Sequence, residues 1–210
     1  MKYRAGMLIA LLLCALPSWS QTDSKAESEA AYTRAIEERA MRITTPLGLT
    51  NETTAARVQG IIVTHYRNLR AIHDRRDESI KNARAATEDA GAAVAAIQAD
   101  AKAKLDQLHT HYLGQLAGDL NQAQIDQVKD GMTFGVLNVT WNAYMKMFPD
   151  LNDEQKAQIR QWLVEARELA MDQGSAGEKH AVFGKYKGRI NNYLSRAGYD
   201  LKKAEQNLRR

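Results

Sequence analysis

The feature of this sequence that most constrains its fold is the three- and four-residue spacing of apolar side chains, which recurs in at least four stretches. Side chains with this spacing lie on one face of an α-helix, and that face packs against other helices. No long alternation of apolar and polar residues, typical of a half-buried strand, occurs. We therefore predict an all-α, single-domain helical bundle of about five or six helices. The clearest stripes are Val58, Ile61, Ile62, His65, Leu69 and Ile72, and Ile159, Trp162, Leu163, Ala166 and Leu169.

The composition agrees with this fold class. Of the 210 residues, 44% are hydrophobic and 26% are charged, which is ordinary for a globular domain and unlike a disordered or fibrous chain. Only three residues are proline and three are phenylalanine, and long runs are rich in alanine, glutamate, lysine, glutamine and leucine. This mixture favours helices and disfavours a sandwich of short strands.

The same pattern predicts where the helices lie. Residues 83–103 are rich in alanine and form either a helix with small contacts or a mobile connector. Residues 129–140 include β-branched side chains, and the sequence leaves open whether they form a helix or an extended loop. The other expected helices are one over residues 24–43, one that starts at residue 50, one through residues 105–116, and those over 152–173, 177–196 and 199–208.

Three segments share a pattern that marks a helix start. Each has a leucine followed by a residue that caps helix N-termini well: Thr50, Asn121 or Asn152. Gln124 and Gln155 stand three residues after their caps, where the side chains complete a capping box. The pattern also resembles the Leu-Thr-x-x-Gln repeats of small helical periplasmic chaperones and stress adaptors. We interpret it as helix capping and keep a chaperone or stress adaptor as the alternative function.

Residues 1–20 have the organisation of a secretory signal peptide. A basic start is followed by an apolar run over residues 7–13, and small serines precede Gln21. The run is too short to span a bilayer, which needs about 20 apolar residues, so we expect no membrane span after cleavage. Cleavage before Gln21 leaves residues 21–210 as a single all-helical domain that is periplasmic or secreted. Lipidation of Cys14, the only cysteine, is disfavoured because a bulky leucine precedes it.

The expected mature chain has no thiol and an almost balanced charge. The chain has 29 basic and 25 acidic residues, and removal of Lys2 and Arg4 leaves 27 basic residues and a net charge of +2. That balance, outside the cytoplasm, argues against nucleic acid as a partner. The fold then depends on its core rather than on disulfides. The sequence has no glycine-rich phosphate loop after a strand and no serine nucleophile elbow, and we predict no cofactor.

The histidines do not form a recognisable metal motif. His73 stands one helical turn before Asp77, and His109 stands two residues before His111. Residues two apart on a helix point to opposite sides, and no third ligand has a suitable spacing, so we predict no metal site. A group of aromatic and methionine side chains is interpreted as core, with a ligand platform as the alternative. Its members are Trp141, Tyr144, Met145, Met147 and Phe148.

The residues after Gly174 are the richest in groups that bind sugars. Aromatic faces, amides that bond hydroxyls, and cations suited to acidic sugars stand close together there. Gly184 and Gly188 each cost about 1 kcal/mol relative to alanine inside a helix. A close helix crossing or an approaching ligand must therefore offset them. The candidate ligand-binding residues are Lys179, Lys185, Tyr186, Lys187, Arg189, Asn191, Asn192 and Tyr193, together with Glu165, Glu168 and Asp172.

The three carboxylates are spaced by three and four residues, so they line one face of the 152–173 helix. Glycoside hydrolysis uses a pair of carboxylates, and a glycan-active enzyme that uses Glu165 or Glu168 is therefore a less favoured alternative. We lean towards a protein without catalytic activity.

The short turn after Asp172 makes the last two long helices antiparallel. Positions equidistant from the turn then face each other, which predicts Asp172 near Lys179 and Glu165 near Lys185 or Tyr186. An interhelical network of ion pairs would explain these residues without any ligand. Both interpretations stay open, because a paired network can also orient groups that bind a ligand.

Several motifs together resemble one known family. They are residues 47–49, 65–67, 129–136 (KDGMTFGV), Thr140, Tyr144, Pro149, 165–168, 170–172, Ser175, Lys179, His180 and 183–194 (FGKYKGRINNYL). On these residues, most of the mature chain resembles the bacterial secreted family catalogued as domain-of-unknown-function family 3826. The resemblance implies a periplasmic or exported protein, described as sugar-binding, from bacteria that degrade polysaccharides. It carries over no catalytic residue.

We therefore predict a non-enzymatic carbohydrate-binding or accessory protein of glycan utilisation, with an acidic glycan or oligosaccharide as its ligand. A concave pocket lined by Trp141, Tyr186, Arg189 and Asn192 would favour the glycan, whereas an open apolar cradle would favour the chaperone alternative. The sequence does not indicate the oligomeric state.

Overall fold

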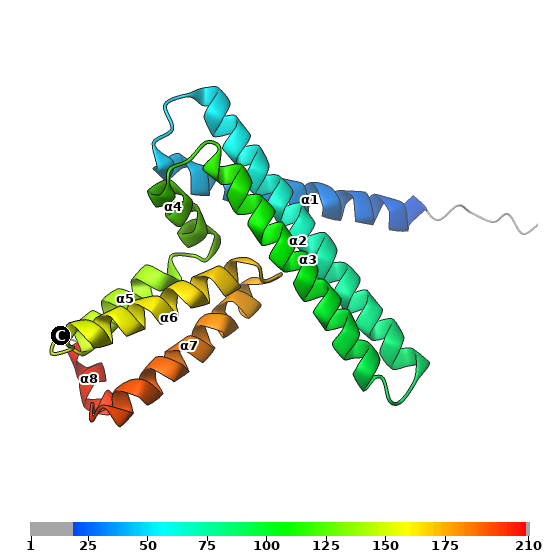
Figure 1. The fold of residues 1–210 in the computed structure, drawn as a ribbon. Coiled ribbons are helices and arrows are strands. Elements are labelled where there is room, and N and C mark those ends of the chain that lie inside the picture. The colour runs from blue at the N-terminus through cyan, green and yellow to red at the C-terminus, as the bar shows by residue number, and fades with distance from the viewer. Residues whose placement is uncertain (1–18, 209–210) are drawn as a thin grey trace, which may run out of the picture. The chain divides into compact units, whose positions relative to one another are not determined.

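The computed structural model describes residues 19–208, and all regular structure in that range is helical (Figure 1). The all-α prediction is therefore confirmed. Within the described range there are eight α-helices and one 3-10 turn, so the expected count of five or six was too low. The elements are α1 (Trp19–Thr44), η1 (Thr45–Leu47), α2 (Glu52–Ala86), α3 (Gly91–Ala117), α4 (Gln122–Met132), α5 (Val136–Met147), α6 (Asp153–Met171), α7 (Ala176–Arg196) and α8 (Leu201–Leu208).

The signal peptide predicted for residues 1–20 lies outside the described residues except for its last two positions. Among the described residues, none of the helices has the length and apolar character needed to cross a membrane.

Two turns explain why the helix count was underestimated. The alanine-rich segment is helical at both ends, but residues 87–90 interrupt it and allow α3 to fold back along α2. Residues 129–140, whose conformation was left open, contain the end of α4 and the start of α5. Between them Phe134 and Gly135 adopt left-handed backbone angles, with φ of 59° and 66°. The N–H of Gly135 donates to the carbonyl oxygen of Asp130 at 2.8 Å, which closes α4.

The Leu-Asn-x-x-Gln segments are helix starts, as predicted. Asn121 with Gln124 begins α4, and Asn152 with Gln155 begins α6, each as a complete capping box. The cap of α2 is Asn51 rather than Thr50, because the side chain of Asn51 accepts the N–H of Thr54 at 2.9 Å. Local capping therefore accounts for the pattern without a specialised function.

The chain forms two compact units that divide after Ala35, within α1. In the second unit, α2 and α3 pack as one helical pair and α6 and α7 as another. The turn between α6 and α7 spans four residues, and the predicted packing of these two helices is confirmed. Helix α5 packs on α6 and α8, while α4 contacts α3, α5 and α6.

A hydrophobic core holds α5, α6, α7 and α8 together. The predicted stripe of α6 is buried at four of its five positions, but Leu169 is 51% exposed and does not belong to the core. Of the aromatic and methionine group, Tyr144 and Phe148 are buried and the other three side chains pack against the core from its edge. The core interpretation of that group is confirmed. The fully buried side chains of this core include Leu137, Ile159, Leu163, Ala166, Ala170, Ile190 and Leu194.

Candidate ligand-binding groove

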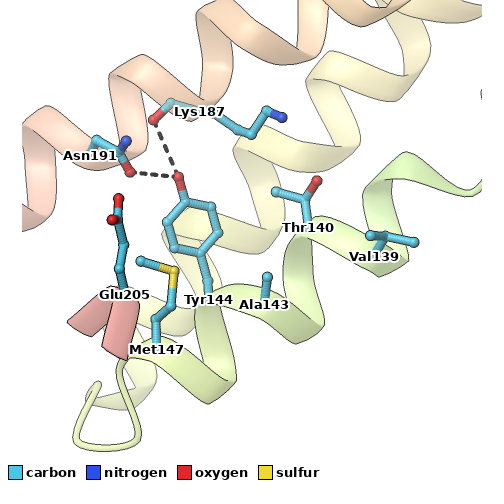
Figure 2. A pocket seen from close by; sticks show the side chains of 8 residues that line it. All are labelled: Val139, Thr140, Ala143, Tyr144, Met147, Lys187, Asn191 and Glu205. Atoms are coloured by element: carbon cyan, nitrogen blue, oxygen red, sulfur yellow. Dashed lines mark hydrogen bonds between the residues drawn. The ribbon is translucent and has the colours of Figure 1, made fainter. Parts of the chain in front are cut away.

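A groove runs between α5 and α7. Both helices pack on α6 while their own backbones stay apart, and α8 lies against both of them. The side chains that α5 presents to the gap include Thr140 and Ala143, which are too short to fill it. The resulting groove is open to solvent and has a volume of about 480 Å³ (Figure 2). Its lining residues are Val139, Thr140, Ala143, Tyr144, Met147, Lys187, Asn191 and Glu205.

Tyr144 fixes the polar centre of the groove. Its ring is buried and packs on Phe148, with 6.3 Å between the ring centroids. The hydroxyl donates to Oδ1 of Asn191 at 2.7 Å and lies 3.3 Å from the carbonyl oxygen of Lys187, as Figure 2 shows. Burial raises the pKa of Tyr144 to about 12, so the hydroxyl keeps its proton at physiological pH. Because Oδ1 of Asn191 accepts this bond, the amide NH₂ is the group left to donate to a ligand.

Lys187 and Glu205 bring opposite charges to the groove from different helices. Lys187 lies on α7 and Glu205 on α8, and both side chains are exposed. Within residues 19–208, neither of these two side chains makes an ion pair. Figure 2 shows the Lys187 side chain extending towards the Thr140 end of the groove and the Glu205 carboxylate at the Asn191 end. The groove is therefore polar, with one charge of each sign.

A different face of α7 contacts α6. Nη1 of Arg189 lies 3.6 Å from Oε2 of Glu165, and its guanidinium carbon lies 4.6 Å from the ring centroid of Trp162. The rings of Trp162 and Tyr193 meet edge to face at 5.3 Å. Burial, followed by the charge of Glu165, raises the pKa of Tyr186. Three of the candidate residues on α7 are thus engaged in contacts between helices.

The contacts of Glu165 agree with the predicted antiparallel register. Glu165 lies near Tyr186, one of the two positions predicted for it, and it pairs with Arg189 on the same helix. Lys185 and Asn192 are exposed and do not line the groove. None of Trp141, Tyr186, Arg189 and Asn192, which the sequence suggested as the lining of a pocket, lines the groove around Tyr144.

Glu168, Asp172 and Lys179 lie in a third environment, where the turn between α6 and α7 meets α3 and α4. Oε2 of Glu168 accepts from Nζ of Lys129 at 2.7 Å, and Oδ2 of Asp172 lies 2.8 Å from Nδ1 of His109. Lys179 is buried and donates to the carbonyl oxygens of Met132 and Met171 at 3.2 and 3.1 Å. Burial lowers the pKa of Lys179 to about 8. We call the polar side chains gathered here the buried polar network; its members are His65, His73, His109, Lys129, Arg167, Glu168, Asp172 and Lys179. All of them except His65 make a side-chain hydrogen bond within residues 19–208.

Five members of the buried polar network were not predicted as a group. Nε2 of His73 lies 2.8 Å from the carbonyl oxygen of Asp172, and Arg167 donates to Asp126 at 2.5 Å and Asp130 at 3.0 Å. The sequence signals were His65, a polar residue within the apolar stripe of α2, and His73 and His109, which were considered only as metal ligands. Among the described residues, no three His, Cys, Asp or Glu side chains are placed to hold a metal ion. Asp77, the partner considered for His73, pairs with Arg76 instead.

Two further questions from the sequence concern the reason for Gly184 and Gly188 and the placement of Glu165 and Glu168. A Cβ atom added to Gly184 or Gly188 would meet nothing within 4 Å, so a close helix crossing does not explain these glycines. Glu165 and Glu168 bind different cations, Arg189 and Lys129, on different helices. Neither carboxylate lines the groove between α5 and α7, but both side chains line a separate open hollow together with Tyr186.

Comparison with known proteins identifies a family but no activity. Residues 33–210 match a family described as "Protein of unknown function (DUF3826)". The match contains the whole of α2 to α8, and with them the groove and the buried polar network. No curated protein matches the chain.

Proposed function

The chain belongs to the DUF3826 family, whose description names no reaction, and we propose its function from the groove itself. It is an exported carbohydrate-binding protein of the periplasm or the cell exterior that acts in glycan utilisation without catalysing a reaction. The glycan occupies the groove between α5 and α7. The observation that carries this proposal is the hydrogen bond from Tyr144 to Asn191, which holds an amide donor at the wall of an open groove.

The groove offers the groups that bind a saccharide. Sugar hydroxyls both donate and accept hydrogen bonds, and Asn191, Tyr144 and Glu205 provide donors and acceptors at one end. Val139 and Met147 present apolar surface suited to the C–H faces of a sugar ring. A groove of mixed polar and apolar lining is what an amphipathic ligand such as a sugar requires.

Lys187 favours an acidic glycan. Its ammonium group has no carboxylate partner within the described range, so a sugar carboxylate can bind it without displacing an existing ion pair. Glu205 at the opposite end repels a second acidic group and accepts from neutral hydroxyls. The groove therefore favours a glycan with its acidic sugar at the Lys187 end.

Two adjacent asparagines test this proposal. Asn191 lines the groove, whereas Asn192 is exposed outside it. We expect Asn191→Ala to weaken glycan binding at least about tenfold, or 1.4 kcal/mol, and Asn192→Ala to leave it unchanged. Binding is measured by glycan array and calorimetry on the mature chain, with an assay for released reducing ends.

Three outcomes contradict the proposal. Equal losses for the two variants place the ligand elsewhere, and released reducing ends show an enzyme. Suppression of client aggregation without any glycan binding supports the chaperone alternative.

A further inference from the structure

Phe134 occupies an unusual position in the turn between α4 and α5. It is 47% exposed, one of four large hydrophobic side chains exposed in the described part of the chain. Its φ of 59° is in the left-handed region, where a bulky residue costs about 1–3 kcal/mol. Glycine would adopt this conformation without strain. Neither burial nor the backbone turn therefore explains an aromatic side chain here.

The exposed ring of Phe134 pairs with a second exposed ring. It stacks on His180 of α7, with 5.6 Å between centroids and 14° between ring planes. His180 is exposed as well. The pair is thus an aromatic platform that faces solvent at the start of α5.

The platform continues into the groove along one face of α7. His180, Gly184, Lys187 and Asn191 follow at intervals of four, three and four residues, so they share a face of the helix. At 1.5 Å per residue, this face is about 16 Å long from His180 to Asn191. Phe134 meets His180 at one end and Tyr144 meets Asn191 at the other, so α5 and α7 run in the same direction along the groove.

Gly184 leaves the helix backbone bare between the platform and Lys187. A Cβ atom added there would meet nothing within 4 Å, so the glycine is not required to make room for a neighbouring part of the chain. Glycine inside a helix costs about 1 kcal/mol relative to alanine. A ligand that passes from the platform to Lys187 would lie against this bare backbone.

We infer that Phe134 and His180 form a stacking subsite for a sugar ring, and that the ligand is an oligosaccharide extending from there over Gly184 to Lys187 and Asn191. This inference rests on the proposed carbohydrate-binding function and adds the ligand's length and direction. The C–H face of one sugar ring covers the aromatic pair, and the carboxylate of another sugar lies at Lys187. A disaccharide fills only the Lys187 to Asn191 part, whereas a hexasaccharide reaches the platform.

Phe134→Gly separates this role from a structural one. Because the variant removes backbone strain, we expect Tm to stay equal or rise. Affinity for the acidic hexasaccharide should fall at least about tenfold, while affinity for the disaccharide stays unchanged. The probes are α-1,4-galacturonic acid oligosaccharides and, as a neutral series, maltooligosaccharides, measured by calorimetry. Leu169→Ala, which removes an equally exposed side chain from α6, is the control and should change neither affinity.

Gly184→Gln provides a second variant. It adds a side chain to open space on the helix, so stability should rise slightly while hexasaccharide binding falls. Unchanged hexasaccharide affinity in both variants, with binding still lost in Asn191→Ala, overturns the subsite and leaves the proposed function standing. If the wild-type chain binds neither series at any length, both the subsite and the proposed function fail.

Discussion

The buried polar network and the groove use the same kinds of side chain in opposite ways. In the network, Lys129 is 7% exposed and lies 2.7 Å from Glu168, and Lys179 donates to two backbone carbonyls. In the groove, Lys187 is exposed and has no carboxylate partner within residues 19–208. The number of charged side chains in a region therefore does not distinguish a ligand site from a structural contact. The partners of each charged side chain distinguish them, because a buried charge must be paired, while an exposed charge without a partner is available to a ligand.

The largest expected effect is on Arg167 of the network. Its buried guanidinium joins α6 to Asp126 and Asp130 of α4. Arg167→Ala removes these two ion pairs and a third with Glu168, and it leaves a cavity, so we expect a loss of about 3 kcal/mol in the free energy of unfolding. Chemical denaturation measures it. Arg189→Ala is the matched control, because that side chain is 55% exposed and its ion pair should contribute less than about 1 kcal/mol. Equal losses would erase the distinction between buried and exposed charges.

The second effect concerns His65 and depends on pH. His65 is buried, stacks on Tyr112 with 3.8 Å between centroids, and has no hydrogen-bond partner on either ring nitrogen. Burial, with smaller contributions from Lys179 and His109, lowers its pKa to about 3. In the unfolded chain His65 binds a proton near pH 6.5, whereas in the folded chain it binds one only near pH 3. Protonation therefore favours the unfolded chain, and this residue destabilises the fold as pH falls. The loss reaches about 2 kcal/mol at pH 5.

His65→Phe keeps the stacked ring and removes the titration. The variant should therefore gain about 2 kcal/mol relative to wild type between pH 7.5 and pH 5, measured by denaturation at both pH values. His109 opposes this trend, because its bond to Asp172 raises its pKa and stabilises the fold most below pH 6.5. Comparison of the variant with wild type cancels that contribution. The control is His111→Gln, a change at an exposed position of α3, which should show no such gain. The prediction is contradicted if the stability of His65→Phe changes with pH by the same amount as that of wild type.

Local chemistry made part of this structure predictable. The capping boxes depend on residues within one turn of each other, and the short connection between α6 and α7 required antiparallel packing. Which of the candidate residues face the groove and which lie elsewhere was not predictable in this way. Lys185 and Lys187 are two residues apart and chemically identical, yet only Lys187 faces the groove, because α5 and α8 lie on that side of α7. Glu205 enters the groove only through the placement of α8.

A smaller effect distinguishes two of the buried tyrosines, Tyr144 and Tyr112. The hydroxyl of Tyr144 holds Asn191 in the groove, whereas that of Tyr112 contacts the sulfur of Met132 at 3.3 Å in the core. Tyr144→Phe and Tyr112→Phe should each cost about 1 kcal/mol of stability or less. Only Tyr144→Phe should also weaken glycan binding, because the Asn191 amide loses its orientation. Equal glycan affinity in both variants, by calorimetry, would show that this orientation is unimportant.

The smallest effect on stability, and the sharpest on function, is expected at Lys185 and Lys187. Both side chains are exposed, so Lys185→Gln and Lys187→Gln should each change the free energy of unfolding by less than about 0.5 kcal/mol. Lys187→Gln should weaken binding of an acidic oligosaccharide about fivefold, which corresponds to about 1 kcal/mol, because one exposed ion pair is lost. Added salt should weaken acidic-glycan binding more in wild type than in Lys187→Gln, since salt screens the charge that the variant lacks. Lys185→Gln should retain the wild-type affinity and salt dependence. If the two lysine variants lose affinity equally, the attraction comes from the overall charge of α7 rather than from a cation placed in the groove.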